Sequence, residues 1–320
     1  MTVLVLTRAL DSTADLVISE LADRDVPVVR MDPGDFPERL GASARISSEL
    51  PSWAGKLRGQ HRDLVLDQVR AVYYRRPSPV RVEAGLSAQA ARWATAEAAA
   101  GVGGLLASMD CTWVNHPHHN AIAGVAPVAL ATAVRCGLPI PETLITNDEE
   151  EARTFIDSLP GRVAAYKALG SAPPEDIDRR PAALWTTQVH AGEIESSLAL
   201  TAHLFQEWVP KAYDVRLTVV AGRMFAAEIH TTSDKARIDI RTDYASHTYV
   251  PCEVPQELAS GVTRLVDEFG LHYAALDFLV THDGVWYFHD LNPNGQWGFI
   301  PELRGPITRA LADLLEGRSS

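Results

Sequence analysis

The last third of the sequence holds two long strand patterns that each turn back on themselves, and this feature restricts the fold most. One pattern covers residues 214–230 and turns at Ala221-Gly222, and the other covers 274–291 and turns at 282–284. A short connection containing glycine between two apolar, β-branched runs is typical of a β-hairpin. We therefore predict an antiparallel sheet in this part of the chain. Helices are predicted around it at 255–269 and 301–315.

The first hundred residues alternate between strand and helix patterns. Strands are predicted at 3–6, 26–30 and 69–74, with helices at 12–23 and 87–106. Such alternation predicts a small open α/β layer. A second unit begins with a helical pattern at 118–135 and continues with strands near 142–146, 162–167, 184–189 and 204–208. The predicted class is α/β, with an α+β C-terminal half, and the predicted domains are 1–115, 116–208 and 209–320.

Charge and cysteine content exclude several classes of protein. The net charge of −12 gives a field that repels nucleic acid and anionic membranes, so neither is an expected partner. The apolar stretches are too short to span a bilayer, and the N-terminus lacks the pattern of a signal peptide. The three cysteines are widely spaced without a CxxC pair, which argues against disulfides or zinc. We expect a cytoplasmic protein.

Lys167 is one of only four lysines, and it ends an apolar strand pattern. Burying an ammonium group is costly unless an anion pairs with it, and phosphate suits so compact a cation. The alternative is a strand-end lysine whose ammonium group reaches solvent.

Two further segments carry charges at strand spacing. Asp214 and Arg216 lie two residues apart, so on a strand they share one face. They form either an ion pair or adjacent ribose and phosphate contacts. In ARIDIR, Arg237, Asp239 and Arg241 show the same spacing, which fits a solvated edge strand or a site for a carboxylate or acyl phosphate.

Asp277, Asp290 and Asn292 form the strongest candidate site. Asp277 lies within an apolar strand pattern, and a hairpin turning at 282–284 brings Asp290 opposite it. Two facing carboxylates repel each other unless a cation lies between them. Asn292 adds a neutral oxygen on the same face, and such oxygen ligands suit Mg²⁺ bound to nucleotide phosphates. The alternative, two unrelated strand aspartates, requires a register shifted by one residue.

Taken together, these residues resemble those of the ATP-grasp ligases in order and spacing. Four motifs narrow the resemblance to the peptide-maturing ATP-grasp enzymes that make graspetides: YYRRP at 73–77, VNHPHHN at 114–120, GLPIPETLITND at 137–148 and NPNGQW at 292–297. The resemblance covers nearly the whole chain. It implies an ATP-grasp fold in which two sheet-containing subdomains clamp ATP behind an N-terminal α/β domain.

The resemblance also implies an activity and a set of site residues. An Asp or Glu side chain of a ribosomal precursor peptide, which has a leader and an acidic core, is activated as an acyl phosphate and cross-linked as an ester or amide. The implied roles are ATP phosphates at Lys167, adenine at Glu207, Trp208 and Val209, ribose near Asp214, Mg²⁺ at Asp277, Asp290 and Asn292, and the γ-phosphate or acyl group at Arg216 and Arg241. The choice between a monomer and a homodimer stays open.

The chain departs from the family pattern at two positions. Ala126 stands where family members usually have a second phosphate-binding lysine, and Asp290 replaces a glutamate. Losing a charge-assisted phosphate contact costs roughly 1.5–3 kcal/mol. Two alternatives to the peptide ligase therefore stay open: a degenerate ATP-grasp protein that binds without turnover, and a ligase of free amino acids or small carboxylates.

A charged loop and a cluster of histidines give weaker signals. The loop at 170–181, rich in proline and charge, is expected to be mobile and is a candidate cover for ATP or the peptide. His116, His118 and His119 lie so close together around Pro117 that they indicate a loop or helix start rather than a metal site.

Overall fold

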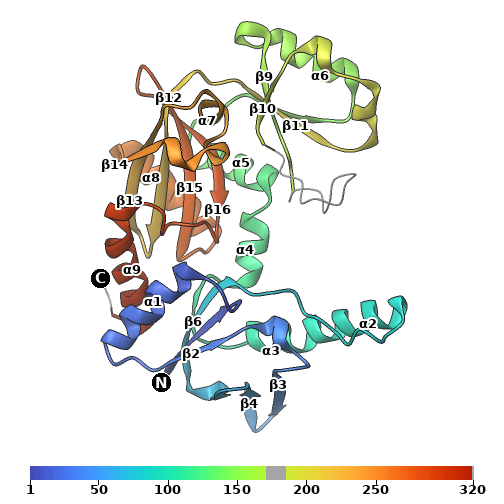
Figure 1. Ribbon diagram of the computed structural model, residues 1–320, viewed down its shortest axis with the longest axis vertical. Helices are drawn as coiled ribbons and strands as arrows, with labels where there is room; N and C mark the ends of the chain where they lie inside the picture. Colours follow the sequence, from blue (N-terminus) through green and yellow to red (C-terminus); the bar gives the residue numbers. More distant parts are fainter. Residues whose placement is uncertain (171–184, 319–320) are drawn as a thin grey trace.

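The computed structural model describes residues 1–170 and 185–318, and within them the strands form four β-sheets (Figure 1). The first is a parallel sheet in the order β2-β1-β6-β7. Its elements and those that cover it are β1 (Thr2–Thr7), α1 (Ser12–Asp23), β2 (Val28–Met31), β6 (Val69–Arg76), α2 (Ala88–Ala98), α3 (Gly104–Ala107) and β7 (Thr112–Val114). The predicted first helix is confirmed, and the Asp11 side chain caps it by accepting from Thr13 N and Ala14 N.

A second, three-stranded sheet was not foreseen from the sequence. It consists of β3 (Gly41–Ser47), β4 (Leu50–Arg58) and β5 (Asp63–Val65), in the order β3-β4-β5. Most of its side chains are exposed, so its strands lack the apolar alternation that would have revealed them. Leu57 and Leu64 are the exceptions, because they pack into the core beneath the parallel sheet.

Two helices lead from the parallel sheet to the central unit: α4 (Pro117–Ala123) and α5 (Ala126–Arg135). They interrupt the single helix expected over 118–135 at Gly124 and Val125. The central unit has an antiparallel sheet in the order β10-β9-β11-β8. Its elements are β8 (Thr143–Thr146), α6 (Glu149–Ser158), β9 (Ala164–Lys167), β10 (Thr187–Val189) and β11 (His203–Glu207). Helix α6 packs on this sheet through Ala152 and Ile156.

The C-terminal sheet has the order β14-β13-β12-β15-β16 and is antiparallel throughout. Its elements and the helices around it are β12 (Lys211–Val220), β13 (Arg223–Thr231), α7 (Asp234–Ile238), β14 (His247–Cys252), α8 (Gln256–Glu268), β15 (Tyr273–Thr281), β16 (Trp286–Asn292) and α9 (Pro301–Glu316). Both predicted hairpins are confirmed. At the first turn Gly222 has φ +80°, a conformation that glycine adopts without strain.

Alternation along β12 divides the C-terminal sheet into two faces. Val215, Leu217 and Val219 pack with α5 and α8 in one core. On the other face Val220 joins α1 and α9 in a second core that connects the N-terminal and C-terminal parts of the chain. Arg216 lies on this second face, so a polar row can form beside an apolar core.

The expectation of strand alternation in ARIDIR is wrong. Residues 234–238 form helix α7, and 240–242 form a single helical turn. Arg237 and Arg241 therefore do not share a strand face. The Asp239 side chain accepts from Arg241 N at 3.0 Å, and this local bond favours a turn over a strand. None of the helices in the described residues is long and apolar enough to cross a membrane.

Candidate active site

Three charged side chains form a row across neighbouring strands of the C-terminal sheet. Arg216 on β12 pairs with Asp277 on β15, and Asp277 pairs with Asp290 on β16. Residues paired in this way place their side chains on the same face. A bulge at His289 produces this register, since regular pairing continued from Phe278 and Phe288 would bring His289 opposite Asp277. The predicted facing of Asp277 and Asp290 is thus confirmed, through a bulge that was not predicted.

Arg216 holds Asp277 through a two-pronged ion pair. The guanidinium donates from Nε to Asp277 Oδ1 at 2.7 Å and from Nη2 to Oδ2 at 3.2 Å. Its Nη1 donates to Gln296 O at 2.8 Å. Three of its five N–H groups are engaged, so two remain for a ligand. Arg216 therefore balances the charge of Asp277 from the side of the row opposite Asp290.

Lys167 reaches this row from the central sheet. Its Nζ donates to His289 O at 3.0 Å and lies 3.5 Å from His289 Nδ1, so one ammonium group connects the end of β9 with β16. The pKa of Lys167 lies below its ordinary value, because the loss of hydration lowers it more than the negative charges of Asp290 and Asp277 raise it. Burial and the neighbouring Lys167 hold the pKa of His289 well below its ordinary value. The imidazole is therefore neutral beside the ammonium group.

Asp290 and Asn292 present oxygen atoms to the same space. The pKa of the Asp290 carboxyl group lies above its ordinary value. Desolvation is the main cause and the charge of Asp277 adds to it, while the charge of Lys167 acts in the opposite direction. Asp290 nevertheless reaches solvent, so a cation has access to it. The Asn292 amide oxygen accepts from Asn294 N at 2.9 Å and keeps a second lone pair. Two carboxylates and one amide fit Mg²⁺, which takes few protein ligands when phosphates supply others.

The described residues contain no cluster of three or more histidine, cysteine, aspartate or glutamate side chains arranged for a metal. A metal in this cleft therefore needs Asn292 or a ligand oxygen in addition to the two aspartates. This favours a hard ion shared with a phosphate over a zinc-like site.

The expected nucleotide residues lie where the central sheet meets β12. Glu207 ends β11, Trp208 follows it half-buried, and Val209 is buried. Asp214 is also buried and accepts from Lys211 Nζ at 2.8 Å. Burial raises the pKa of Asp214 to about 6, although the Lys211 charge lowers it.

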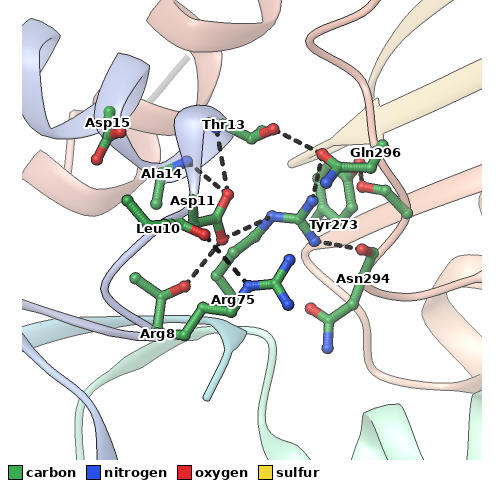
Figure 2. A network of polar contacts seen from close by, with 12 residues as sticks. Arg8, Leu10, Asp11, Thr13, Ala14, Asp15, Arg75, Tyr273, Asn294 and Gln296 are labelled. Atoms are coloured by element: carbon green, nitrogen blue, oxygen red, sulfur yellow. Dashed lines mark hydrogen bonds and ion pairs between the residues drawn. The ribbon is translucent and has the colours of Figure 1, made fainter. Parts of the chain in front are cut away.

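The NPNGQW segment that follows β16 is anchored by the N-terminal sheet. Figure 2 shows Arg75, the last residue but one of β6 and 1% exposed, between Asp11 and this segment. Its guanidinium donates to Asn294 O and, at 2.8 Å, to Gln296 Oε1. Thr13 Oγ1 donates to the same Gln296 oxygen at 2.6 Å. Because Gln296 O accepts from Arg216, the chain of contacts continues to Asp277.

Asn115, from the VNHP motif, provides a second anchor. Its side-chain nitrogen donates to Tyr273 O at 2.8 Å and Pro293 O at 3.0 Å, and its oxygen accepts from Tyr273 N at 2.9 Å. Gly295 allows the segment to approach β15, because a Cβ there would lie 2.3 Å from Ala275 Cβ. The motifs around residues 75 and 115 therefore position the segment beside Asn292.

Comparisons with known proteins agree over the whole chain. Residues 2–121 match the family model of the MvdD pre-ATP grasp domain. A RiPP-associated ATP-grasp ligase from Chryseobacterium gregarium, solved with ADP and a leader and core peptide, is 25% identical with a TM-score of 0.90, covering 100% of this chain and 97% of its own. In fold, and over its full length, the chain is similar to the RiPP-associated ATP-grasp ligases. RiPPs are ribosomally made peptides that are modified after synthesis.

Two macrocyclases from Microcystis aeruginosa MRC are also similar to this ligase. MdnC, solved with the precursor peptide MdnA, is 25% identical with a TM-score of 0.86, covering 99% of this chain and 100% of its own. MdnB is 25% identical with a TM-score of 0.80, and 98% of each chain is covered. No curated protein sequence is significantly similar to the ligase.

The structure brings four of the predicted site residues of the ligase into one cleft: Lys167, Arg216, Asp277 and Asp290. Arg241 is tied instead to Asp239, to which its Nη2 donates at 2.5 Å, and its guanidinium lies 5.4 Å from the centre of the Trp185 ring. The roles assigned to these residues stay predictions. The loop expected to cover the site, at 170–181, lies outside the described residues from 171 onward.

Four residues that shape the site were not assigned a role from the sequence: Arg75, Lys211, His289 and Gln296. Arg75 and Gln296 lie in the motifs that carried the family resemblance, so a signal for them existed. The backbone of His289 matters more than its ring, because its carbonyl oxygen accepts from Lys167. The histidine cluster is a helix start as expected, since His118 N donates to His116 Nδ1 at the N-terminus of α4.

The buried Asp214 should make stability depend on pH. Its pKa rises from 3.8 to about 6 in the folded state, so between these values the folded chain binds a proton that the unfolded chain releases. This contribution is complete below pH 3.8 and is lost as pH rises through about 6. Between pH 5 and 7.5 the free energy of unfolding of wild type, relative to Asp214→Asn, should fall by about 1–2 kcal/mol. Urea unfolding at both pH values measures it.

An exposed aspartate provides the matched control for this experiment. The Asp67→Asn variant should show the same pH dependence as wild type, because Asp67 is exposed on the surface of the N-terminal part. An unchanged difference between wild type and Asp214→Asn across this pH range would contradict the assignment.

Proposed function

We propose that this ligase uses Mg²⁺ and ATP to cross-link side chains of a ribosomal precursor peptide with a leader and an acidic core. The observation that carries the proposal is the similarity, over the full length, to two solved enzymes, one bound to a leader and core peptide and the other to a precursor peptide. The charged row facing Lys167 supports it, because this arrangement suits a polyphosphate. Three free cysteines are compatible with a reducing cytoplasm, where we place the reaction.

In this proposal the nucleotide lies between the central and C-terminal sheets. Lys167 holds its phosphates, Glu207, Trp208 and Val209 contact adenine, and Asp214 lies near the ribose. Asp277, Asp290 and Asn292 would hold Mg²⁺, which neutralises charge on the phosphate oxygens when it is bound. Ala126, the first residue of α5, contributes no cation, so Lys167 carries more of the phosphate binding.

The reaction then needs two displacements. A carboxylate oxygen of the peptide bonds to the γ-phosphorus, the bond to ADP breaks, and an acyl phosphate results. A serine or threonine hydroxyl or a lysine amine then bonds to the acyl carbon, loses its proton, and phosphate leaves. Arg216 and Arg241 would stabilise the negative charge on the transferred group. Asp277 holds the Arg216 fork in a fixed orientation, so little reorganisation is needed.

A ligation assay tests the proposed function. The chain is incubated with ATP, Mg²⁺ and a candidate precursor peptide, chosen from short open reading frames found by sequencing around its gene, and the products are analysed by mass spectrometry. The expected result is the loss of one water per cross-link, together with one ADP formed. Omitting ATP and replacing Asp290 by asparagine are the controls, and both should leave the mass of the peptide unchanged.

Other outcomes would contradict the proposal and identify an alternative. Peptide binding without a change in mass would favour a binding protein that lacks turnover. ADP formation with free amino acids or small carboxylates, but not with the peptide, would favour a small-molecule ligase.

A further inference from the structure

A cavity of about 790 Å³ lies beside the charged row and is lined by several parts of the chain. Helix α1 and strand β6 contribute from the N-terminal part, β12 and β16 from the C-terminal sheet, and the start of α9 with its preceding segment from the C-terminus. Four arginines line it: Arg76, Arg216, Arg241 and Arg304. In a chain of net charge −12, such a local concentration of cations favours an anionic ligand.

The four arginines fall into two pairs with different partners. Arg216 is bound to Asp277, and Arg241 is bound to Asp239. Arg76 and Arg304, by contrast, have no carboxylate within 4 Å among the described residues. Arg304 uses only its Nε, which donates to Gly298 O at 2.8 Å. The Arg76 guanidinium makes no hydrogen bond with any described residue. The unsatisfied cations of the cavity are therefore Arg76 and Arg304.

Arg76 is the more informative of the two, because it is half-buried. Desolvation lowers the pKa of its guanidinium, and the adjacent charge of Arg75 lowers it further. A partly desolvated cation without a counter-ion is unfavourable in the free protein and becomes favourable when an anion binds. The guanidinium fork matches a carboxylate in geometry.

The rest of the cavity wall fits an acidic peptide side chain. Hydroxyl groups of Ser12 and Thr13 line it, as do the apolar side chains of Leu16 and Phe299. The apolar groups can contact the methylene groups of aspartate or glutamate. The Ser12 hydroxyl group can donate to the carboxylate, whereas that of Thr13 already donates to Gln296. Lys167 does not line this cavity, whereas Arg216 and Arg241 do, so the cavity adjoins the proposed position of the transferred phosphate and extends away from Lys167.

We propose that Arg76 and Arg304 form a subsite that binds a carboxylate of the peptide substrate and selects acidic cores over neutral ones. This inference rests on the proposed function and deepens it. The charges of Arg216 and Arg241 are already paired with aspartates, whereas those of Arg76 and Arg304 have no counter-ion among the described residues. They are specificity residues that need take no part in the phosphoryl transfer.

Peptide binding in the presence of Mg²⁺ and ADP tests the subsite without turnover. Two fluorescent probes are used, one with the sequence Ser-Glu-Glu-Asp and one with Ser-Gln-Gln-Asn, and their Kd values are measured by anisotropy. Wild type should bind the acidic probe more tightly. Replacing Arg76 or Arg304 by glutamine should weaken binding of the acidic probe about tenfold. Binding of the neutral probe and of ADP should stay unchanged.

Arg309→Gln is the matched control, because Arg309 lies on α9, is exposed and does not line the cavity. Equal binding of the two probes to wild type, or an acidic preference that survives in both variants, would overturn the proposal. Weaker ADP binding with unchanged probe binding would show that the anion is a phosphate. Because Arg304 is exposed, Arg304→Gln remains informative if Arg76→Gln does not fold.

The ligation assay separates the subsite from the proposed function. Suppose that wild type cross-links the peptide and that the Arg76 and Arg304 variants have the same KM for the peptide as wild type. The subsite proposal is then wrong, while the proposed function stands. If wild type does not cross-link the peptide but still prefers the acidic probe in an arginine-dependent manner, the reverse holds.

Discussion

Replacing Lys167 by methionine is expected to lower ATP-dependent ligation about 10²–10³-fold, the effect of removing one fixed charge that stabilises a transition state. The ammonium group of Lys167, at the end of β9, reaches β16 and lies beside the charged row on β15 and β16. Methionine keeps most of the length of the side chain and removes the charge together with the hydrogen-bond donors. ADP release and peptide mass, measured at saturating peptide, report the loss.

The fold should tolerate this change. Asp290 reaches solvent, so it does not become a buried unpaired charge when Lys167 is replaced. We expect the melting temperature to stay close to that of wild type, and Lys167→Arg to retain part of the activity. Lys56→Met removes an exposed lysine from β4 and is the control for net charge. Ligation at the wild-type rate in Lys167→Met would refute the phosphate-binding role.

Replacing Arg75 by methionine is expected to impair both stability and turnover. Arg75 is fully buried, and its loss leaves Asn294 O and Gln296 Oε1 without a charged donor. Removing such a buried partner costs about 3–5 kcal/mol of unfolding free energy. Because the segment it anchors begins at Asn292, we also expect a lower kcat and a higher Mg²⁺ requirement at temperatures where the variant is folded.

A core variant of similar cost separates positioning from general destabilisation. Leu64→Ala opens a cavity in the core under the N-terminal sheet, remote from this segment, and should cost about 2–5 kcal/mol. Below its melting temperature it should turn over like wild type. If Leu64→Ala and Arg75→Met lose the same fraction of activity at equal folded fraction, Arg75 has no positioning role.

The hairpins of the C-terminal sheet were predictable because their signals are local. In each hairpin, the glycine of the turn and the apolar alternation of the two flanking strands lie within one short stretch of sequence. These glycines are Gly222 and Gly284. The same local rules failed for ARIDIR. There a short alternation looks like a strand, but Asp239 bonds to its own neighbouring backbone and closes a turn. They also missed β3–β5, whose exposed strands carry little apolar pattern.

The facing of Asp277 and Asp290 shows how a correct prediction can depend on an unseen feature. Regular pairing from the turn would have placed His289 opposite Asp277. The bulge at His289 moves Asp290 into that position, and no single residue type in the sequence predicts such a bulge.

The sequence by itself determined the strands, the turns and the residues that carry charge, because these follow from backbone preferences and hydrophobic alternation over short distances. Only the tertiary structure decided which charges meet. Arg75 and its partners on the NPNGQW segment are about 220 residues apart, and Lys167 and His289 are 122 apart. It also decided which arginines lack a counter-ion among residues 1–170 and 185–318, since Arg216 and Arg241 are held by aspartates there while Arg76 and Arg304 are not. Contacts of this kind depend on how whole sheets pack against one another, and short-range sequence patterns do not predict that packing.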